Sequence, residues 1–295
     1  MRLNKLSLVC VLLVTCTYVH ADTIPVLYGG IGRGSGVNAG ALITVDQTTG
    51  AGTVLGNPAG KSGLTGLVFD PVLGLLFGTG NNNSTFEGGT SQLFRIDLVG
   101  ALIGSPVDIT DGGSPIAISD LALQPSTGLL YGTSISTTTF TNTIYTLDKV
   151  TGVATLVGNT GVTGATLAFA PNGTLYMTSA EFNPDGSFLQ GFLNTVDPST
   201  GDVLSTSDPY TTAHVGGLGV RPDGVIFASG GMLGDIYTLG STGTQTLLGL
   251  TGVGGVGDLA FVVPEPSTFG LLAIATFLLI SGRVRFVARR SRVNR

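Results

Sequence analysis

A single histidine, His214, lies in the body of the chain, and its imidazole is the side chain best suited to proton transfer near neutral pH. It directly precedes Val215-Gly216-Gly217, where an apolar strand is expected to begin. A catalytic histidine is normally oriented by a second polar group, and no neighbouring histidine or cysteine accompanies this one. We therefore expect a structural role and keep His214 as the one candidate catalytic residue.

Aspartates followed closely by Thr-Gly recur in a pattern that could be mistaken for calcium loops. The segments are Asp46–Gly50, Asp148–Gly152 and Asp197–Gly201. Calcium needs several oxygen ligands that converge from within a few residues, and one carboxylate in each segment is too few. An aspartate at the start of a turn accepts hydrogen bonds from the turn amides, and glycine takes the positive φ that returns the chain. The pattern predicts capped hairpin turns and no metal site.

Two other segments carry more polar side chains. Thr79–Thr85 with Glu87, and Asp108–Gly113, could each hold a cation or hydrogen-bond a sugar. Clusters of Asn, Asp and Gly more often form plain turns, and a binding site is the alternative. Asn183–Gly186 is expected to be a turn of the same kind.

The sequence argues against several other chemistries. Both cysteines, Cys10 and Cys16, lie near the N-terminus, so a chain without its leader would contain no disulfide, thiolate nucleophile or cysteine metal site. Gly32–Gly36 has the wrong spacing for the nucleophile elbow of a serine hydrolase. Gly29–Gly40 is glycine-rich, but no amphipathic helix follows it, which argues against a dinucleotide site. We predict neither a cofactor nor a metal.

Four short strands recur in fixed order along the body of the chain. These strands must position the side chains of any site. The first is apolar and runs into a turn with proline and glycine, such as Pro71 with Gly74. The second is aliphatic and aromatic, the third ends in aspartate in four of five copies, and the fourth is aliphatic. The first-strand copies are Gly66–Phe69, Asp120–Leu123, Thr166–Phe169, Gly217–Val220 and Asp258–Phe261. The fourth-strand copies are Thr53–Gly56, Ala101–Gly104, Thr155–Gly158, Val203–Ser205 and Thr246–Gly249.

The repeat length identifies the architecture. Successive third-strand ends lie 43 to 51 residues apart, and such periods built from four short strands are typical of β-propeller blades. The 47 glycines and a charged fraction of only 11% also favour short strands and tight turns. The chain enters the pattern on a second strand at Val26 and leaves it on a first strand, Asp258–Val262. We predict an all-β, five-bladed propeller of four-stranded blades, closed by N- and C-terminal strands that share one blade.

Charged residues are segregated along the chain. Between Asp22 and Val263 there are five basic residues and seventeen acidic ones. An acidic body repels the phosphate backbone of nucleic acid and anionic membrane surfaces, so we exclude nucleic acid as a partner. Six arginines are concentrated instead in Arg283–Arg295.

Residues 1–21 have the three parts of a secretory signal peptide. Two basic residues precede the apolar stretch Leu6–Thr15, and small residues then allow cleavage between Ala21 and Asp22. The apolar stretch is too short to span a bilayer. A buried N-terminal strand, an uncleaved anchor and a lipoprotein modified at Cys16 are the alternatives.

The segment 264–295 also has three parts. Pro264, Glu265 and Pro266 come first, the uncharged apolar run Phe269–Ile280 follows, and the arginine cluster comes last. This order and spacing resemble the PEP-CTERM sorting domain. The resemblance implies a C-terminal transmembrane helix, recognition by an exosortase-type membrane enzyme, cleavage near the Pro-Glu-Pro motif, and release to the surface or extracellular matrix of a Gram-negative bacterium. A plain C-terminal tail anchor is the alternative.

The chain is thus divided into a signal peptide (1–21), a propeller (22–263) and a sorting signal (264–295). The repeats are similar to those of bacterial surface propellers of the NHL, YVTN and quinoprotein-like types, which implies architecture and not function. We expect a non-catalytic surface or matrix protein that binds polysaccharide or another protein, is associated with exopolysaccharide or biofilm, and is anchored in the inner membrane before processing. The alternative is a secreted propeller enzyme, such as a glycan lyase or lactone hydrolase, that uses His214.

Overall fold

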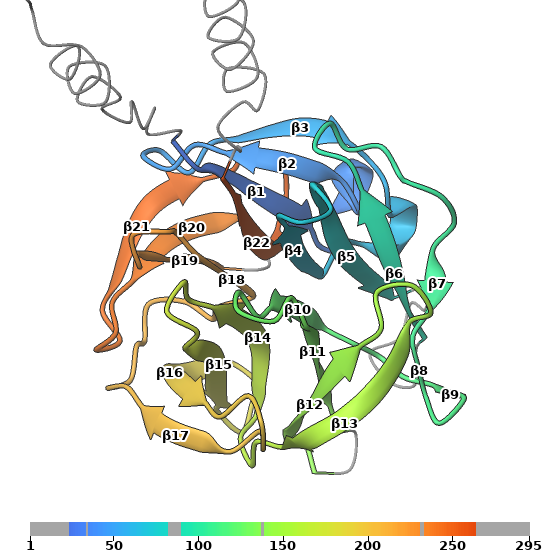
Figure 1. Ribbon diagram of the computed structural model, residues 1–295. Coiled ribbons are helices and arrows are strands. Elements are labelled where there is room, and N and C mark those ends of the chain that lie inside the picture. Colours follow the sequence, from blue (N-terminus) through green and yellow to red (C-terminus); the bar gives the residue numbers. More distant parts are fainter. Residues whose placement is uncertain (1–23, 34, 82–89, 137–138, 231–232, 264–295) are drawn as a thin grey trace, which may run out of the picture. The chain divides into compact units, whose positions relative to one another are not determined.

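The structure of the protein, a computed structural model, describes residues 24–33, 35–81, 90–136, 139–230 and 233–263. Pro25–Val262 form one compact unit, an all-β ring of five sheets around a central axis (Figure 1). The predicted cleavage site at Ala21 and Asp22 and the sorting segment from Pro264 onward, with its predicted transmembrane helix, lie outside the described residues. Within the part of the chain that is described, no helix has the length and apolarity needed to cross a membrane.

Each sheet is one blade, and its four main strands run antiparallel to their neighbours. From the axis outward, blade one consists of β22 (Val256–Val262), β1 (Val26–Ile31), β2 (Leu42–Val45) and β3 (Gly52–Gly56). Blade two consists of β4 (Gly66–Asp70), β5 (Leu75–Asn81), β6 (Ser91–Ile96) and β7 (Val107–Asp108). Blade three consists of β10 (Asp120–Leu123), β11 (Leu130–Ile135), β12 (Asn142–Leu147) and β13 (Val153–Asn159). Blade four consists of β14 (Gly164–Phe169), β15 (Leu175–Phe182), β16 (Phe188–Val196) and β17 (Val203–Thr206), and blade five of β18 (Gly217–Val220), β19 (Ile226–Ser229), β20 (Asp235–Leu239) and β21 (Gln245–Leu250).

The two ends of the ring pair within blade one. β1 runs antiparallel to β22, with Val26 opposite Val262 and Gly30 opposite Asp258. The inner strand of this blade therefore comes from the end of the compact unit, and its other three strands come from the beginning. The predicted five blades and their shared closing blade are confirmed.

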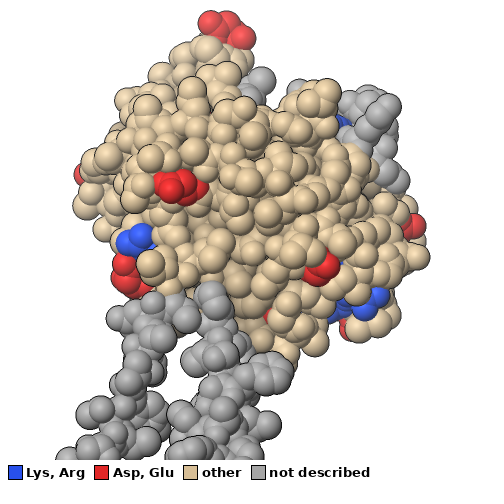
Figure 2. All heavy atoms as spheres, turned by 90° about the horizontal axis from the view of Figure 1, so that it is seen from above, with Lys and Arg blue, Asp and Glu red and all other residues tan. Residues whose placement is uncertain are grey.

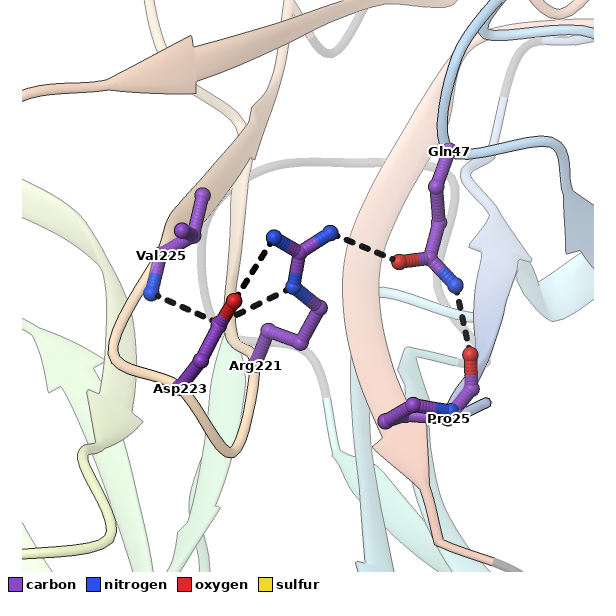
Figure 3. Close-up of polar contacts among 5 residues, drawn as sticks. All are labelled: Pro25, Gln47, Arg221, Asp223 and Val225. Atoms are coloured by element: carbon purple, nitrogen blue, oxygen red, sulfur yellow. Dashed lines mark hydrogen bonds and ion pairs between the residues drawn. The ribbon is translucent and has the colours of Figure 1, made fainter. Parts of the chain in front are cut away.

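A chain of polar contacts reinforces this closure between blades five and one (Figure 3). Arg221, in the β18–β19 turn, donates to the two carboxylate oxygens of Asp223 at 2.9 and 2.8 Å and to the side-chain oxygen of Gln47 at 3.2 Å. Gln47, in the β2–β3 turn, donates to the carbonyl of Pro25, just before β1. The guanidinium also lies 5.4 Å from the ring centroid of Phe227. Arg221 thus ties the start of the ring to its last blade.

The hydrophobic core is divided into five clusters, each of which lies between two neighbouring blades. Successive side chains of a strand point to opposite faces, so alternate residues pack against different neighbours. In β10, Leu121 packs toward blade two and Ala122 toward blade four. Phe77 and Phe227 are fully buried, and burial of a side chain of this size contributes about 1.5–3 kcal/mol. Each blade is therefore held from both sides.

Blade two departs from the predicted pattern at its fourth strand. The prediction of Ala101–Gly104 was wrong, because the regular pairing with β6 occurs further along the chain, at β7. Leu102 forms only an isolated bridge to Ile96. Two residues explain the interruption: Gly104 adopts a φ of 72°, and Pro106 has no amide hydrogen to donate to a neighbouring strand.

The connection after β7 adds two short strands to the next blade. β8 (Thr110–Asp111) and β9 (Ser114–Pro115) form a hairpin that turns at Gly112 and Gly113, both with positive φ. β8 pairs in parallel with β13, so the sheet of blade three has six strands. The polar segment Asp108–Gly113 therefore forms the end of β7 and most of this hairpin.

Candidate functional site

The aspartates at the ends of the third strands cap their turns, as predicted. One carboxylate oxygen of Asp46 accepts the hydroxyl and the amide of Thr48 at 2.6 and 2.9 Å and the amide of Thr49 at 2.8 Å. These hydrogen bonds, from the Thr48 hydroxyl above all, stabilise the charged form and lower the pKa of Asp46. Asp97, Asp148 and Asp197 accept turn amides in a similar way. These four carboxylates therefore have a structural role, as hydrogen-bond acceptors for the turn amides.

The other polar segments divide between turns, strands and undescribed residues. Asn183–Gly186 is a turn, as predicted, in which the amide of the last residue donates to the carbonyl of the first at 2.8 Å. Asp108 accepts a hydrogen bond from the side chain of Gln92 at 2.9 Å. Thr79–Thr85 and Glu87 fall largely outside the described residues. Nowhere in the described ranges do three His, Cys, Asp or Glu side chains gather in a way that could hold a metal ion.

Two aspartates occupy the axis of the ring, at equivalent positions of two inner strands. Asp120 begins β10 and Asp258 lies in β22, whereas the other blades have Gly66, Thr166 and Gly217 at this position. Asp120 and Asp258 are 1% and 0% exposed, and their carboxyl groups hydrogen-bond to each other. The sequence held a signal for them, an acidic residue at the head of an apolar strand. The repeat pattern predicts these segments only as apolar strands, and two of the five copies carry the aspartate.

The two carboxyl groups link all five blades through backbone amides. Asp258, in blade one, accepts the amide of Leu67 in blade two at 2.6 Å and that of Leu218 in blade five at 3.2 Å. Asp120, in blade three, accepts the amide of Leu167 in blade four at 2.7 Å. We call these two side chains the axial aspartate pair.

Burial raises the pKa of both members of the axial aspartate pair, because the protein interior solvates a charged carboxylate poorly. The pKa of Asp258 rises to about 7. For Asp120, the negative charge of Asp258 adds to the effect of burial. At neutral pH a proton shared by the pair lets Asp120 donate to Asp258. Neither carboxyl group reaches solvent. The role of the pair is therefore structural: it joins the inner strands of neighbouring blades.

The inner strands approach each other too closely for side chains at two of the equivalent positions. A Cβ on Gly217 would collide with the Cα of Asp258, and a Cβ on Gly66 would lie 2.6 Å from Oγ1 of Thr79. Backbone and the axial aspartate pair therefore fill the axis at this level. Oγ1 of Thr79 is the one buried side-chain oxygen or nitrogen, among the residues described, without a hydrogen-bond partner.

His214 lies in the connection between β17 and β18, against the β15–β16 hairpin. Its ring centroid is 5.7 Å from that of Phe182 and 5.8 Å from that of Phe188. Burial lowers its pKa, so the imidazole is neutral at pH 7. No hydrogen bond or ion pair joins its ring to another described residue. The structure thus places His214 just before the apolar strand β18, as expected, but brings no described acidic residue beside it.

Two basic side chains on the described surface, Lys149 and Arg221, engage acidic neighbours. Nζ of Lys149 lies 2.6 Å from a carboxylate oxygen of Asp70, and Arg221 contacts Asp223. Figure 2 shows one side of the molecule, where a few charged side chains are scattered among uncharged ones. That side offers no broad basic surface to an anionic polymer.

Comparisons with known proteins identify the architecture. No family model and no curated protein matches the sequence, but solved structures match the fold. A protein assigned as a gluconolactonase superposes with a TM-score of 0.50 and 17% identity, over 83% of this chain and 84% of that one. The body of this chain is a β-propeller.

Two further similar structures have lower TM-scores. One is the periplasmic gluconolactonase of Pseudomonas aeruginosa, with a TM-score of 0.45, 14% identity and coverage of 82% of this chain and 100% of that one. The other is in a nidogen–laminin complex, with a TM-score of 0.48, 12% identity and coverage of 80% and 98%. At such identities the likeness concerns the fold alone.

Proposed function

We propose that the protein is an exported propeller that a C-terminal sorting signal delivers to the cell surface or extracellular matrix, where it binds polysaccharide or another protein without catalysis. The observation that supports a binding role without catalysis is that the aspartates described above are engaged in hydrogen bonds that hold the fold together. The axial aspartate pair links the blades and the third-strand aspartates cap turns. These carboxyl groups are engaged in the scaffold and are not free for acid–base chemistry. Association with exopolysaccharide or biofilm follows from the proposed location.

Export and sorting are supported by the order of the sequence elements. β22, which closes the ring, ends at Val262, and the motif Pro264-Glu265-Pro266 follows directly. Cleavage at this motif would leave the closing strand whole and would remove the six arginines of Arg283–Arg295. The proposed partner is an exosortase-type membrane enzyme, and the proposed anchor before cleavage is the apolar run Phe269–Ile280.

Intact-mass measurement of the protein from surface and inner-membrane fractions tests the sorting proposal. We expect the surface form to begin at Asp22 and to end near Pro264–Pro266. Glu265→Ala should leave the uncleaved form in the inner membrane, because the motif is the proposed recognition element. A surface form that retains Arg283–Arg295 would overturn the processing step.

A secreted glycan lyase or lactone hydrolase is the second candidate, and one observation favours it. His214 is neutral at pH 7 and therefore able to accept a proton. Glycan arrays combined with product assays on the same glycans and on lactones separate the two candidates. We expect binding without product; a product that the native chain forms and His214→Ala does not would overturn the non-catalytic role.

A further inference from the structure

Four aromatic rings form a cluster beside the tip of the β15–β16 hairpin, which we call the aromatic platform. Phe182 and Phe188 end and begin the two strands, with ring centroids 6.3 Å apart. Tyr210 stacks on Phe188 at 6.4 Å, and His214 contacts both phenylalanines. Tyr210 is 3% exposed and Phe182 is 49% exposed. The platform therefore has a buried base and an exposed outer ring.

The connection between β17 and β18 holds the platform in a fixed position. Tyr210 and Gly191 exchange both of their backbone hydrogen bonds at 2.8 Å, and a Cβ on Gly191 would collide with the Tyr210 ring. Further along, Ala213 donates to and accepts from the side chain of Gln245 at 3.0 and 3.1 Å. A surface ordered in this way loses little conformational freedom when it binds a ligand.

The ring nitrogens of His214 are available to a ligand. No described residue hydrogen-bonds to them, and they are not among the buried unpartnered atoms of the described chain. His214 is half-buried, so part of its ring is open to solvent. A neutral imidazole offers one donor and one acceptor, which matches a hydroxyl group, since a hydroxyl also donates and accepts.

The charge around the platform disfavours an anionic ligand. Glu181 and Asp185 are the ionisable residues of the hairpin tip, and the sequence from Leu175 to Gly216 contains neither Lys nor Arg. Glu181 accepts a hydrogen bond from the side chain of Gln190 at 2.7 Å. Negative charge at the hairpin tip repels a polyanion.

We propose that the aromatic platform binds an uncharged polysaccharide. The C–H face of a sugar ring packs on the exposed ring of Phe182, and a sugar hydroxyl bonds to His214. Exposed apolar surface rimmed by polar groups is a general mark of binding sites. This inference rests on the proposed binding function and adds to it the surface and the class of ligand.

Affinity electrophoresis of the full chain, in native gels that contain a polysaccharide, tests the platform. Dextran and hydroxyethyl cellulose are the uncharged probes, and alginate is the anionic probe. We expect at least one uncharged polymer to retard the chain and alginate not to. Phe182→Leu keeps an apolar side chain but removes the ring, so it should weaken binding about tenfold. Phe182→Tyr keeps the ring and should retain the binding.

Phe140→Ala is the matched control, because Phe140 is 61% exposed and belongs to the β11–β12 connection of blade three. It should leave binding unchanged, and thermal unfolding should show that every variant is folded. Binding that Phe182→Leu does not weaken, or that Phe140→Ala weakens equally, would overturn the platform and leave the proposed function standing. Retardation by alginate alone, or Phe182-dependent capture of a protein in place of a glycan, would overturn the ligand class. No binding to any polysaccharide or protein would overturn the proposed function as well.

Discussion

The carboxyl group of Asp120 hydrogen-bonds to that of Asp258 at the axis of the ring, and together they accept amides from the inner strands of three further blades. An inner strand has a partner strand on one side only, so its amides that point to the axis need another acceptor. The axial aspartate pair supplies that acceptor for Leu67, Leu167 and Leu218. Two side chains thereby hold five blades in register with one another.

Asp258→Ala should destabilise the propeller strongly. The substitution leaves the buried amides of Leu67 and Leu218 without an acceptor and deprives Asp120 of its partner. Each unpartnered buried group costs about 1–3 kcal/mol, so we expect a loss of roughly 3 kcal/mol or more in urea unfolding followed by circular dichroism. Asp208→Ala is the control, because Asp208 is exposed and its loss should cost less than about 0.5 kcal/mol. Equal midpoints for the two variants would contradict the linking role.

The stability of the ring should fall as the pH rises through neutrality. A carboxyl group whose pKa is raised on folding stabilises the folded state most at low pH, and this contribution is lost as the pH passes the folded-state pKa. For Asp258 that pKa is about 7, and one proton accounts for at most about 1.4 kcal/mol per pH unit. Asp46 acts oppositely: its lowered pKa gives a contribution that is lost at strongly acidic pH.

Urea midpoints measured between pH 4 and pH 9 check this dependence. In Asp120→Asn, the side-chain amide donates to Asp258 permanently and so favours its charged form. We expect the decline near neutral pH to disappear in this variant while it persists in Asp208→Ala. A native protein whose midpoint stays constant from pH 6 to pH 9 would show that the pair carries no shared proton.

The repeats predicted the ring because each blade follows local rules. Alternating apolar residues, a proline turn and an aspartate-capped turn act within a single blade, so Val26 could be assigned to pair with the strand of Asp258 from order alone. The shift of the fourth strand in blade two depends on Gly104 and Pro106, which interrupt one repeat only.

The candidate sites depend on contacts between blades, which spacing in the sequence does not report. Asp120 and Asp258 stand 138 positions apart and meet because the ring closes. Phe182 and His214 meet because the connection after β17 folds back over the β15–β16 hairpin. The sequence identified His214 as a candidate but gave no indication of its aromatic neighbours.

Arg221→Met should loosen the contact between blades five and one. The variant loses the hydrogen bond to Gln47 and the cation–π contact with Phe227, while a methionine still covers the aromatic ring. We expect a loss of about 1 kcal/mol in urea unfolding. A double-mutant cycle with Gln47→Ala should give a nonzero coupling energy, whereas strictly additive effects would mean that the contact in Figure 3 does not link the blades.

Gly217→Ala should disrupt the axis, although it adds a single methyl group. The new Cβ would collide with the backbone of Asp258, so the inner strands of blades five and one must separate and the hydrogen bond from Leu218 to Asp258 must lengthen. Overpacking of this kind costs about 1–3 kcal/mol, and the weakened hydrogen bond adds to that cost. The result should be a clear decrease in the thermal unfolding midpoint.

Gly186→Ala separates this steric effect from the ordinary cost of replacing a glycine. Gly186 has a φ of 82° and nothing within 4 Å of the position of a Cβ, so the variant carries only the conformational cost of about 1 kcal/mol. Gly217 has no positive φ, so its replacement by alanine destabilises the fold only through the steric collision with Asp258. If the inner strands are packed as closely as described, Gly217→Ala lowers the unfolding midpoint more than Gly186→Ala, and the reverse order would contradict that packing.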